Sequence, residues 1–387
     1  MSTQTIHIIG AGLSGATLAR LLADHGYSIC IYEMNHHLGG NCYDYFNQYG
    51  ILVQKYGPHI FHTNKKHIYD FVKHFAKFKI NQVKVLANIN DKLIDLPINF
   101  KAVDFFSPHH AMAIKRFIKS NWPQQKSIPI NELINCQDKQ TQEWANFIFE
   151  HVYKNYSAKM WGIPIEKLDL DVLKRVGITP NYQCNYFPND KYQGIPVNGF
   201  SKMIENMLTH KLIKIINHKP TIKLKDNKTY IDRKLITAPI FYCGQVDELL
   251  NYRYGQMPFR SLFFKFETKK INSFQPASII NYPSHPTITR IAEYKKINNQ
   301  TIKGVTTISL EHPGEYDVNS VKFNKPYYPI NNQANIAQYQ KYVKELSQYP
   351  NFHLLGRLAE YKYFDMDDAI ENAMSKFKTL VSKISSE

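Results

Sequence analysis

The chain has 387 residues, 43% of them hydrophobic, and a formal net charge of +16. This length allows two or three domains with a buried core, and no apolar run approaches the ~18 residues of a membrane helix, so we expect no integral membrane contact. The positive charge comes mostly from lysines spread along the chain, without a basic helix or an RNA-binding motif, which argues against a nucleic-acid partner. A basic surface that helps to capture an anionic substrate is the preferred interpretation.

Cysteine usage and the start of the chain bear on localisation. The five cysteines are scattered, odd in number and without metal-ligand spacing. The first apolar run begins almost at the N-terminus, which leaves no room for a signal peptide. We therefore predict a cytoplasmic protein with no disulfide framework and no metal site.

The stretch 6–33 has the order of a dinucleotide-binding unit: an apolar strand, a glycine turn, an amphipathic helix, a second apolar strand and an acid. Its first glycine permits a tight turn, its second lets the backbone approach a pyrophosphate, and its third lets the helix lie close to the sheet. The acid would accept hydrogen bonds from an adenosine ribose. These cofactor-binding candidates are Gly10, Gly12, Ser14, Gly15 and Glu33.

A second glycine turn, Gly39-Gly40-Asn41, follows the acid after five residues. This extension resembles FAD enzymes of the glutathione-reductase-like superfamily, particularly the amine-oxidase-like branch, rather than nicotinamide dehydrogenases. An ordinary Gly-Gly turn is the alternative interpretation.

The next segments contain two histidines and a predicted hairpin. His59 and His62 lie in QKYGPHIFHTN without carboxylates or cysteines nearby, so they are either structural or placed beside a flavin ring. Residues 83–99 read as two short strands with a turn at Asn90-Asp91. From about 100 to 175 the pattern becomes helical and aromatic-rich, which predicts an inserted helical domain.

Arg175 follows this helical region, and Gly177 and Pro180 come shortly after it. A glycine and a proline so close together are typical of a mobile loop or the edge of a lid. Residues 193–209 then predict a glycine turn into a helix with Ser201 as its N-cap.

Two strands are expected next, near 212–216 and at 235–243, and the second ends at Gly244, where the backbone would approach the cofactor closely. Residues 259–330 alternate as in an antiparallel sheet, and a final helix is predicted over roughly 367–384.

The segment before that helix is the most specific one. A buried strand, FHLL, leads to Gly356 and Arg357, and a polar aromatic loop then reaches a helix start at Asp365 and Met366. Amides at such a helix start could stabilise the negative charge of a reduced flavin.

Taken together, the motifs GAGLSG, HLGGN, YGPHIFHTN, YSAKMWG, YQGIPV, PYYP and GRLAEYKYFDM resemble the bacterial UDP-galactopyranose mutase family over nearly the whole chain. The resemblance implies an isomerase with FAD as cofactor, active when reduced, and a nucleotide-sugar substrate. It implies interconversion of UDP-galactopyranose and UDP-galactofuranose through a covalent adduct with reduced FAD, with no net redox change. It also implies a homodimer.

The same resemblance implies roles for individual residues. Arg175 and Arg290 would clamp the diphosphate and stabilise the departing UDP, while His59 and Arg357 would face the flavin. Asp365 would lie at the active-site end of the last helix, as a substrate-binding residue. The remaining substrate-binding candidates are Tyr186, Tyr328 and Tyr363 for the phosphates, Tyr156 for the uracil, Trp161 for the sugar, and His62 and Arg260.

Val83 departs from the family pattern, which commonly has a polar residue near the hexose. A missing hydrogen-bond donor there would cost ~1–3 kcal/mol, so mutases for dTDP-fucopyranose or UDP-N-acetylgalactosamine remain alternatives. An amine-oxidase-like flavoenzyme and a non-catalytic nucleotide-binding module are the rivals from other classes. The arginines and tyrosines fit an anionic diphosphate better than the apolar substrate cage of an amine oxidase.

The predicted fold class is α/β: an FAD-binding, Rossmann-like domain with an inserted helical domain and an antiparallel sheet domain. We expect the FAD-binding domain at 1–80, 190–255 and 340–387, the helical domain at 100–180, and the antiparallel sheet domain at 81–99 and 256–339.

Overall fold

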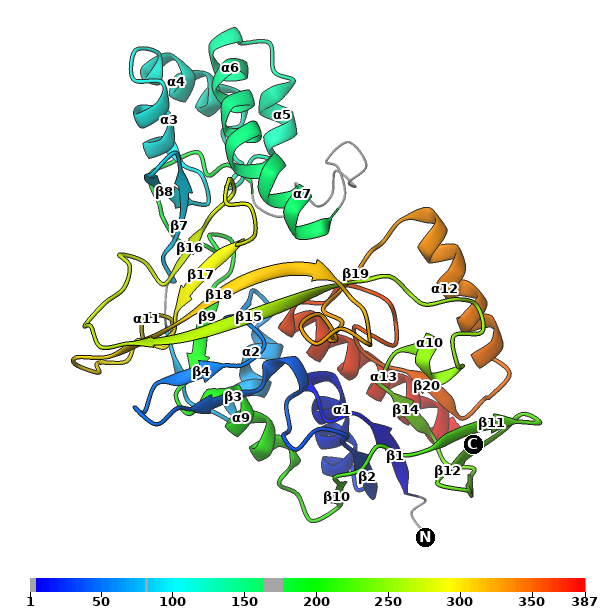
Figure 1. The fold of residues 1–387 in the computed structure, drawn as a ribbon. Coiled ribbons are helices and arrows are strands. Elements are labelled where there is room, and N and C mark those ends of the chain that lie inside the picture. The colour runs from blue at the N-terminus through cyan, green and yellow to red at the C-terminus, as the bar shows by residue number, and fades with distance from the viewer. Residues whose placement is uncertain (1–4, 81–82, 163–176, 387) are drawn as a thin grey trace.

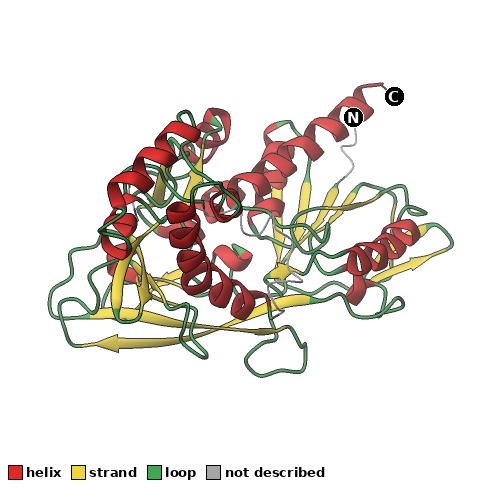
Figure 2. Cartoon of the chain, turned by 90° about the horizontal axis from the view of Figure 1, so that it is seen from above, coloured by secondary structure: helices red, strands yellow, loops and turns green. Residues whose placement is uncertain are grey.

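The computed structural model describes residues 5–80, 83–162 and 177–386. Three parts are stacked in Figure 1, with a parallel sheet and its helices at one end, a long antiparallel sheet in the middle and a helical part at the other end. Viewed from above, long strands run along one edge of the molecule beneath the helices (Figure 2). One continuous cluster of buried apolar side chains links the parallel sheet, the antiparallel sheet and the helical part.

The parallel sheet is assembled from distant parts of the chain. Its five strands are arranged in the order β10-β2-β1-β14-β20, and every neighbouring pair is parallel. The central strands β1, β2 and β14 are almost entirely buried, which suits a sheet that is covered on both faces, whereas the edge strand β10 is not buried. The strands are β1 (Ile6–Ile9), β2 (Ile29–Tyr32), β10 (Ile213–Ile216), β14 (Ile240–Tyr242) and β20 (Phe352–Leu354).

Helices α1 (Leu13–Asp24), α9 (Gly199–Leu208) and α13 (Met366–Ser386) pack together beside this sheet. Helix α1 follows the glycine turn as predicted, and α13 covers the predicted final helix. The Rossmann-like arrangement is therefore confirmed.

The antiparallel sheet has seven strands in the order β19-β15-β18-β17-β16-β7-β8. Only the β16–β7 pair is parallel. Asn90 and Asp91 both have positive φ angles, of 48° and 62°, which is the two-residue turn that an Asn-Asp pair favours in a hairpin. The strands are β7 (Val85–Ile89), β8 (Lys92–Leu96), β15 (Phe259–Lys269), β16 (Ile279–Asn281), β17 (Arg290–Glu293), β18 (Thr306–Glu315) and β19 (Tyr328–Pro329).

The helical part contains a long continuous rod. Helix α6 (Lys139–Ile148) passes without a break into a π-helical segment η2 (Phe149–Lys154) and then into α7 (Asn155–Trp161). The other helices are α3 (Phe100–Phe106), α4 (Ala111–Asn121) and α5 (Ile130–Ile134). Asn99 and Asp138 cap α3 and α6 with their side chains.

Smaller elements complete the chain. Strands β5 (Phe61–Thr63) and β6 (Phe78–Lys79) pair with opposite edges of β9 (Tyr192–Pro196), and β3 (Asp44–Phe46) pairs with β4 (Leu52–Gln54). Beyond these, the structure contains η1 (Gly40–Cys42), α2 (Lys66–Lys73), β11 (Ile222–Lys225), β12 (Lys228–Ile231), β13 (Lys234–Ile236), α10 (Val246–Leu249), α11 (Tyr294–Ile297) and α12 (Gln333–Leu346).

Two local predictions are wrong. Ser201 lies inside the first turn of α9, and the carboxylate of Asp44 accepts from the amides of Phe200 and Ser201 instead, at 2.7 and 2.9 Å. The strand expected at 235–243 is two strands, β13 and β14, because a Thr-Ala-Pro segment interrupts it.

The residue boundaries proposed for the three domains stay predictions. In the part of the chain that the structure describes, no helix combines the length and the apolar composition needed to cross a membrane.

Candidate active site

The two glycine turns lie back to back. Gly39 forms a bridge with Gly12, and its amide donates to the carbonyl of Ala11 at 2.9 Å. A Cβ atom on Gly40 would lie 3.2 Å from Gly12 Cα. Asn41 belongs to the short helix η1 that follows this contact. Side chains at either glycine would therefore narrow a backbone-lined cradle at the N-terminus of α1, where an anionic pyrophosphate is favoured.

Close packing around this cradle accounts for three further glycines. A Cβ on Gly15 would lie 2.0 Å from the carbonyl oxygen of Gly10, which requires the helix to touch the strand. Gly356, with φ +87°, faces Ser14, whose Oγ would lie 2.9 Å from an added Cβ. At Gly244 the space is filled by the hydroxyl of Tyr242, at 2.5 Å. A side chain at position 244 would therefore have to displace the ring of Tyr242.

Glu33 marks the outer end of the cradle. It follows β2, is only 4% exposed, and accepts through Oε2 from the amide of Ala11 at 2.9 Å. Its Oε1 accepts from the amide of Asn35 at 2.8 Å. The carboxylate is thereby fixed beside the glycine turn, where a ribose hydroxyl group is bound in dinucleotide folds.

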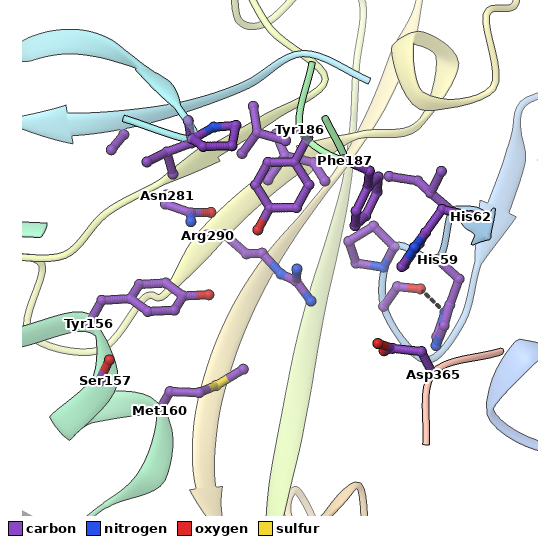
Figure 3. A pocket seen from close by; sticks show the side chains of 18 of the residues that line it. His59, His62, Tyr156, Ser157, Met160, Tyr186, Phe187, Asn281, Arg290 and Asp365 are labelled. Carbon is purple, nitrogen blue, oxygen red and sulfur yellow. Dashed lines mark hydrogen bonds between the residues drawn. The ribbon is translucent and has the colours of Figure 1, made fainter. Parts of the chain in front are cut away.

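A cavity of about 640 Å³ lies between the antiparallel sheet, helix α7 and the segment before α13. Figure 3 shows Arg290 in its middle, with the hydroxyls of Tyr156 and Tyr186 on one side and His59 and Asp365 on the other. Sequence-predicted residues from most of the chain line this one cavity: His59, His62, Tyr156, Trp161, Tyr186, Arg290, Tyr328, Arg357, Tyr363, Asp365 and Met366.

A row of polar residues crosses the sheet beneath the cavity. Arg290 on β17 is paired with Asn281 on β16 and with Glu311 on β18. Its Nε donates to Glu311 Oε2 at 2.7 Å, and the Glu311 side chain is 1% exposed. Burial lowers the pKa of Arg290, but the charge of Glu311 more than offsets this and raises it. The guanidinium thus stays charged in the cavity.

Aromatic rings form the opposite wall. The rings of Tyr328 and Tyr363 stack with centroids 5.8 Å apart, and Trp161 lies 6.2 Å from Tyr328. The guanidinium of Arg357 lies over Tyr363 at 4.8 Å, and the Tyr363 hydroxyl donates to Asp365 Oδ1 at 2.8 Å. On α7, which also carries Trp161, burial raises the pKa of Tyr156, so this phenol stays protonated. The site therefore offers hydroxyls and cations together.

The two histidines have different surroundings. His59 Nδ1 contacts the carbonyl of Gly57 at 2.8 Å, so this nitrogen carries the hydrogen and Nε2 is left as an acceptor in the neutral ring. Burial lowers the pKa of His59 to about 4. His62 contacts Asp190 at 2.7 Å and stacks on Phe187 at 3.7 Å. His59 is therefore neutral at physiological pH.

Two of the predicted substrate-binding residues that the structure describes do not line this cavity. Val83 is 2% exposed within the hydrophobic core and does not line the cavity. Arg260 is buried outside the cavity lining, where it donates to the carbonyls of Met160 and Lys159 at the end of α7. Arg175 lies outside the described residues. Asn281 and Glu311 were not predicted from the sequence. They are recognised only once their strands, β16 and β18, are seen to flank the strand of Arg290.

Comparison with known proteins decides the family. Residues 151–363 match the family model of UDP-galactopyranose mutase, and residues 8–75 match an NAD(P)-binding Rossmann-like domain. The UDP-galactopyranose mutase of Mycoplasma pneumoniae is 36% identical over 97% of this chain and 95% of its own length. This chain belongs to the UDP-galactopyranose mutase family.

Two further sequence relatives and one solved structure resemble this chain over nearly its whole length. The UDP-galactopyranose mutase of Mycoplasma genitalium is 37% identical (97% of this chain, 95% of its own), and the dTDP-fucopyranose mutase of Escherichia coli is 31% identical (95% and 96%). A crystal structure of reduced UDP-galactopyranose mutase matches the fold with a TM-score of 0.69 at 15% identity, covering 99% of this chain and 94% of that one.

FAD is the cofactor of this family member, and the chain fits it. Gly12 and Gly40 keep the backbone free of side chains at the N-terminus of α1, as close approach of a pyrophosphate requires, and Glu33 is fixed beside this turn. His59, Arg357 and Met366 line the cavity from segments that follow this cradle and the FHLL strand.

Proposed function

We propose that this chain is an FAD-dependent isomerase that interconverts UDP-galactopyranose and UDP-galactofuranose without net oxidation. Arg290 is the observation that carries the proposal: a cation held by buried Glu311 projects into a cavity rich in tyrosine hydroxyls. Such a constellation binds a diphosphate through charge-assisted hydrogen bonds. Both Mycoplasma relatives are UDP-galactopyranose mutases, which supports the same substrate.

In this proposal the diphosphate binds Arg290, together with the hydroxyls of Tyr186, Tyr328 and Tyr363. Arg175, paired with Arg290 on sequence grounds, completes the clamp. Tyr156 packs on the uracil, and Trp161 lies by the sugar. Because UDP gains negative charge as it leaves the anomeric carbon, cations fixed in a shielded site stabilise the transition state more than the ground state.

His59, Arg357 and Met366 lie on the cofactor side of the cavity in this proposal. When bound and reduced, FAD supplies the nucleophile for the anomeric carbon. Neutral His59 presents its Nε2 acceptor without adding positive charge, and Arg357 lies over Tyr363. Met366 begins α13, and the amides of a helix start favour an anion, although Asp367 and Asp368 add negative charge to this turn. These side chains keep the sugar between the diphosphate clamp and the cofactor.

Turnover under reducing and oxidising conditions tests this proposal. We expect chromatography to show interconversion of the two UDP-galactose isomers when the purified protein is reduced with dithionite, and none when it is oxidised. Equal rates in both states would contradict the role of reduced FAD.

A second substrate test uses dTDP-fucopyranose, because one relative carries the name of that mutase. We expect kcat/KM at least tenfold lower than for UDP-galactopyranose. A higher value would reassign the substrate.

We further propose that the protein is a cytoplasmic homodimer. A nucleotide-sugar substrate and the family resemblance support this. Light scattering coupled to size-exclusion chromatography tests the assembly, and a mass near 45.2 kDa would instead indicate a monomer.

A further inference from the structure

Lys159 on α7 extends its side chain into a group of backbone carbonyls from another segment. Its Nζ lies 2.8 Å from the carbonyl of Tyr282, 3.2 Å from that of Pro283, 2.5 Å from that of His285 and 2.7 Å from that of Ile288. In the described parts of the chain, no carboxylate pairs with this ammonium. The four carbonyl oxygens point at the ammonium from several sides, as they would around a small bound cation. They take the place of the water molecules that accept hydrogen bonds from an exposed ammonium.

The carbonyls belong to the loop of residues 282–289, which joins β16 to β17. Asn281 directly precedes this loop and Arg290 directly follows it, and both residues line the cavity. The loop adds internal bonds, since His285 Nδ1 accepts from the amides of Thr287 and Ile288 at 3.1 and 3.0 Å. Lys159 therefore sits at the centre of the turn that carries Arg290 into the site.

The helix that bears Lys159 lines the same cavity. Tyr156, Ser157, Met160 and Trp161 on α7 contribute to its wall. At the end of α7, Arg260 from β15 donates to the carbonyl of Met160 at 2.8 Å and to that of Lys159 at 3.3 Å.

Gly162 ends this helix with φ +68°, and an added Cβ would lie 2.3 Å from the Arg260 guanidinium. Arg260 thus satisfies carbonyls that the helix itself leaves without partners. Two cations fasten α7 to the sheet, one at its end and one against the loop.

We propose that Lys159 is a positioning residue that sets the distance between the α7 wall and Arg290 across the cavity. Without the ammonium, four carbonyl oxygens would face one another with no donor between them, and the loop would relax away from α7. The groups proposed to bind the uracil and the diphosphate would then no longer match one ligand. The proposal rests on the proposed function only for the identity of that ligand.

The test compares Lys159→Met with Lys154→Met. Both remove one charge from the same rod, but Lys154 makes an exposed pair with Glu150 at 2.9 Å. We expect Lys159→Met to keep its FAD content and to raise the Kd for UDP about tenfold, while Lys154→Met stays within twofold of the wild type. Unchanged UDP affinity in Lys159→Met would overturn the proposal. Failure of the wild-type protein to bind UDP would instead contradict the proposed function.

A rescue experiment separates positioning from a general loss of folding. Lys159→Ala leaves a carbonyl-lined space that methylammonium can enter, whereas tetramethylammonium has no N–H to donate. We expect methylammonium, added during purification and assay, to restore at least half of the lost UDP affinity, and tetramethylammonium to restore none. No restoration, or equal restoration by both ions, would overturn the proposal, and this holds even if Lys159→Met folds poorly.

Discussion

Arg290 and Glu311 face each other on strands β17 and β18, with Nε and Oε2 2.7 Å apart. Glu311 also accepts from the hydroxyl of Thr289 at 2.7 Å, so the carboxylate is held from two sides. One nitrogen of the guanidinium is used by this pair, which leaves the other two to project into the cavity. The pair therefore fixes both the charge and the direction of Arg290.

Replacing Arg290 by Met should lower kcat/KM by about 100-fold, because one charge-assisted clamp in a shielded site supplies ~3 kcal/mol of transition-state stabilisation. The substitution also leaves the buried carboxylate of Glu311 without its cationic partner, which should lower the free energy of unfolding by about 3–5 kcal/mol. Arg290→Met/Glu311→Gln should regain stability without regaining activity. Steady-state kinetics and urea denaturation measure both effects, and recovery of activity in the double variant would contradict the role of Arg290.

The pH dependence of stability should report on His59. Its pKa is lowered to about 4 in the folded protein, against 6.5 in the unfolded chain. Between these values the unfolded state binds the extra proton, so stability is fully present above pH 6.5 and is lost as the pH falls towards 4.

His59→Gln removes this titration. Between pH 7 and pH 5 we expect the free energy of unfolding of this variant to fall by about 1–2 kcal/mol less than that of the wild type. Urea denaturation of the FAD-bound proteins at the two pH values gives the comparison, and parallel losses would show that His59 is not held neutral.

Gly15→Ala should disrupt the cofactor cradle, since its Cβ would lie 2.0 Å from a backbone oxygen. We expect a loss of about 1–3 kcal/mol in stability from this overpacking, together with little bound FAD. Gly26→Ala, beyond the other end of α1, has open space around it and tests backbone strain alone. The flavin absorbance of the two purified proteins measures the difference, and equal FAD content would refute the close-packing argument.

Asp44→Ala should destabilise the protein by about 2 kcal/mol, because the amides of Phe200 and Ser201 lose their buried acceptor. Asp44→Asn retains one side-chain oxygen, so its loss should be smaller. Denaturant titration ranks the two variants, and an Asp44→Ala protein as stable as the wild type would show that α9 does not need this cap.

Features encoded within a few residues were predictable from the sequence. The glycine turn before α1, the Asn90-Asp91 hairpin and strand β20 follow from local sequence patterns. The same kind of turn signal, at Asp226-Asn227 and Asp232-Arg233, marks the β11–β13 meander, which sequence analysis overlooked.

Contacts between distant segments were not predictable. The Asp44 cap of α9 joins residues more than 150 positions apart, and Ser201 was chosen because it lies beside the helix in sequence. Arg260 matched a family position, but its direction towards α7 depends on how the sheet and the helix meet. Val83 is a core residue for the same reason: a motif does not state which face of the chain meets the cavity.

The π-helical segment Phe149–Lys154 joins helix α6, whose side chains pack in the core, to helix α7, whose side chains line the cavity. Before it, Trp144 and Ile148 pack in the core; after it, Tyr156 and Met160 line the cavity. Each residue of an α-helix turns the side chains by about 100°, and a π-turn contains one extra residue per turn. The number of residues in this segment therefore sets which way the binding wall faces. A one-residue deletion that turned this segment into regular α-helix would keep Tyr156 facing the cavity, whereas the same deletion within α6 would rotate Tyr156 by about 100° away from it.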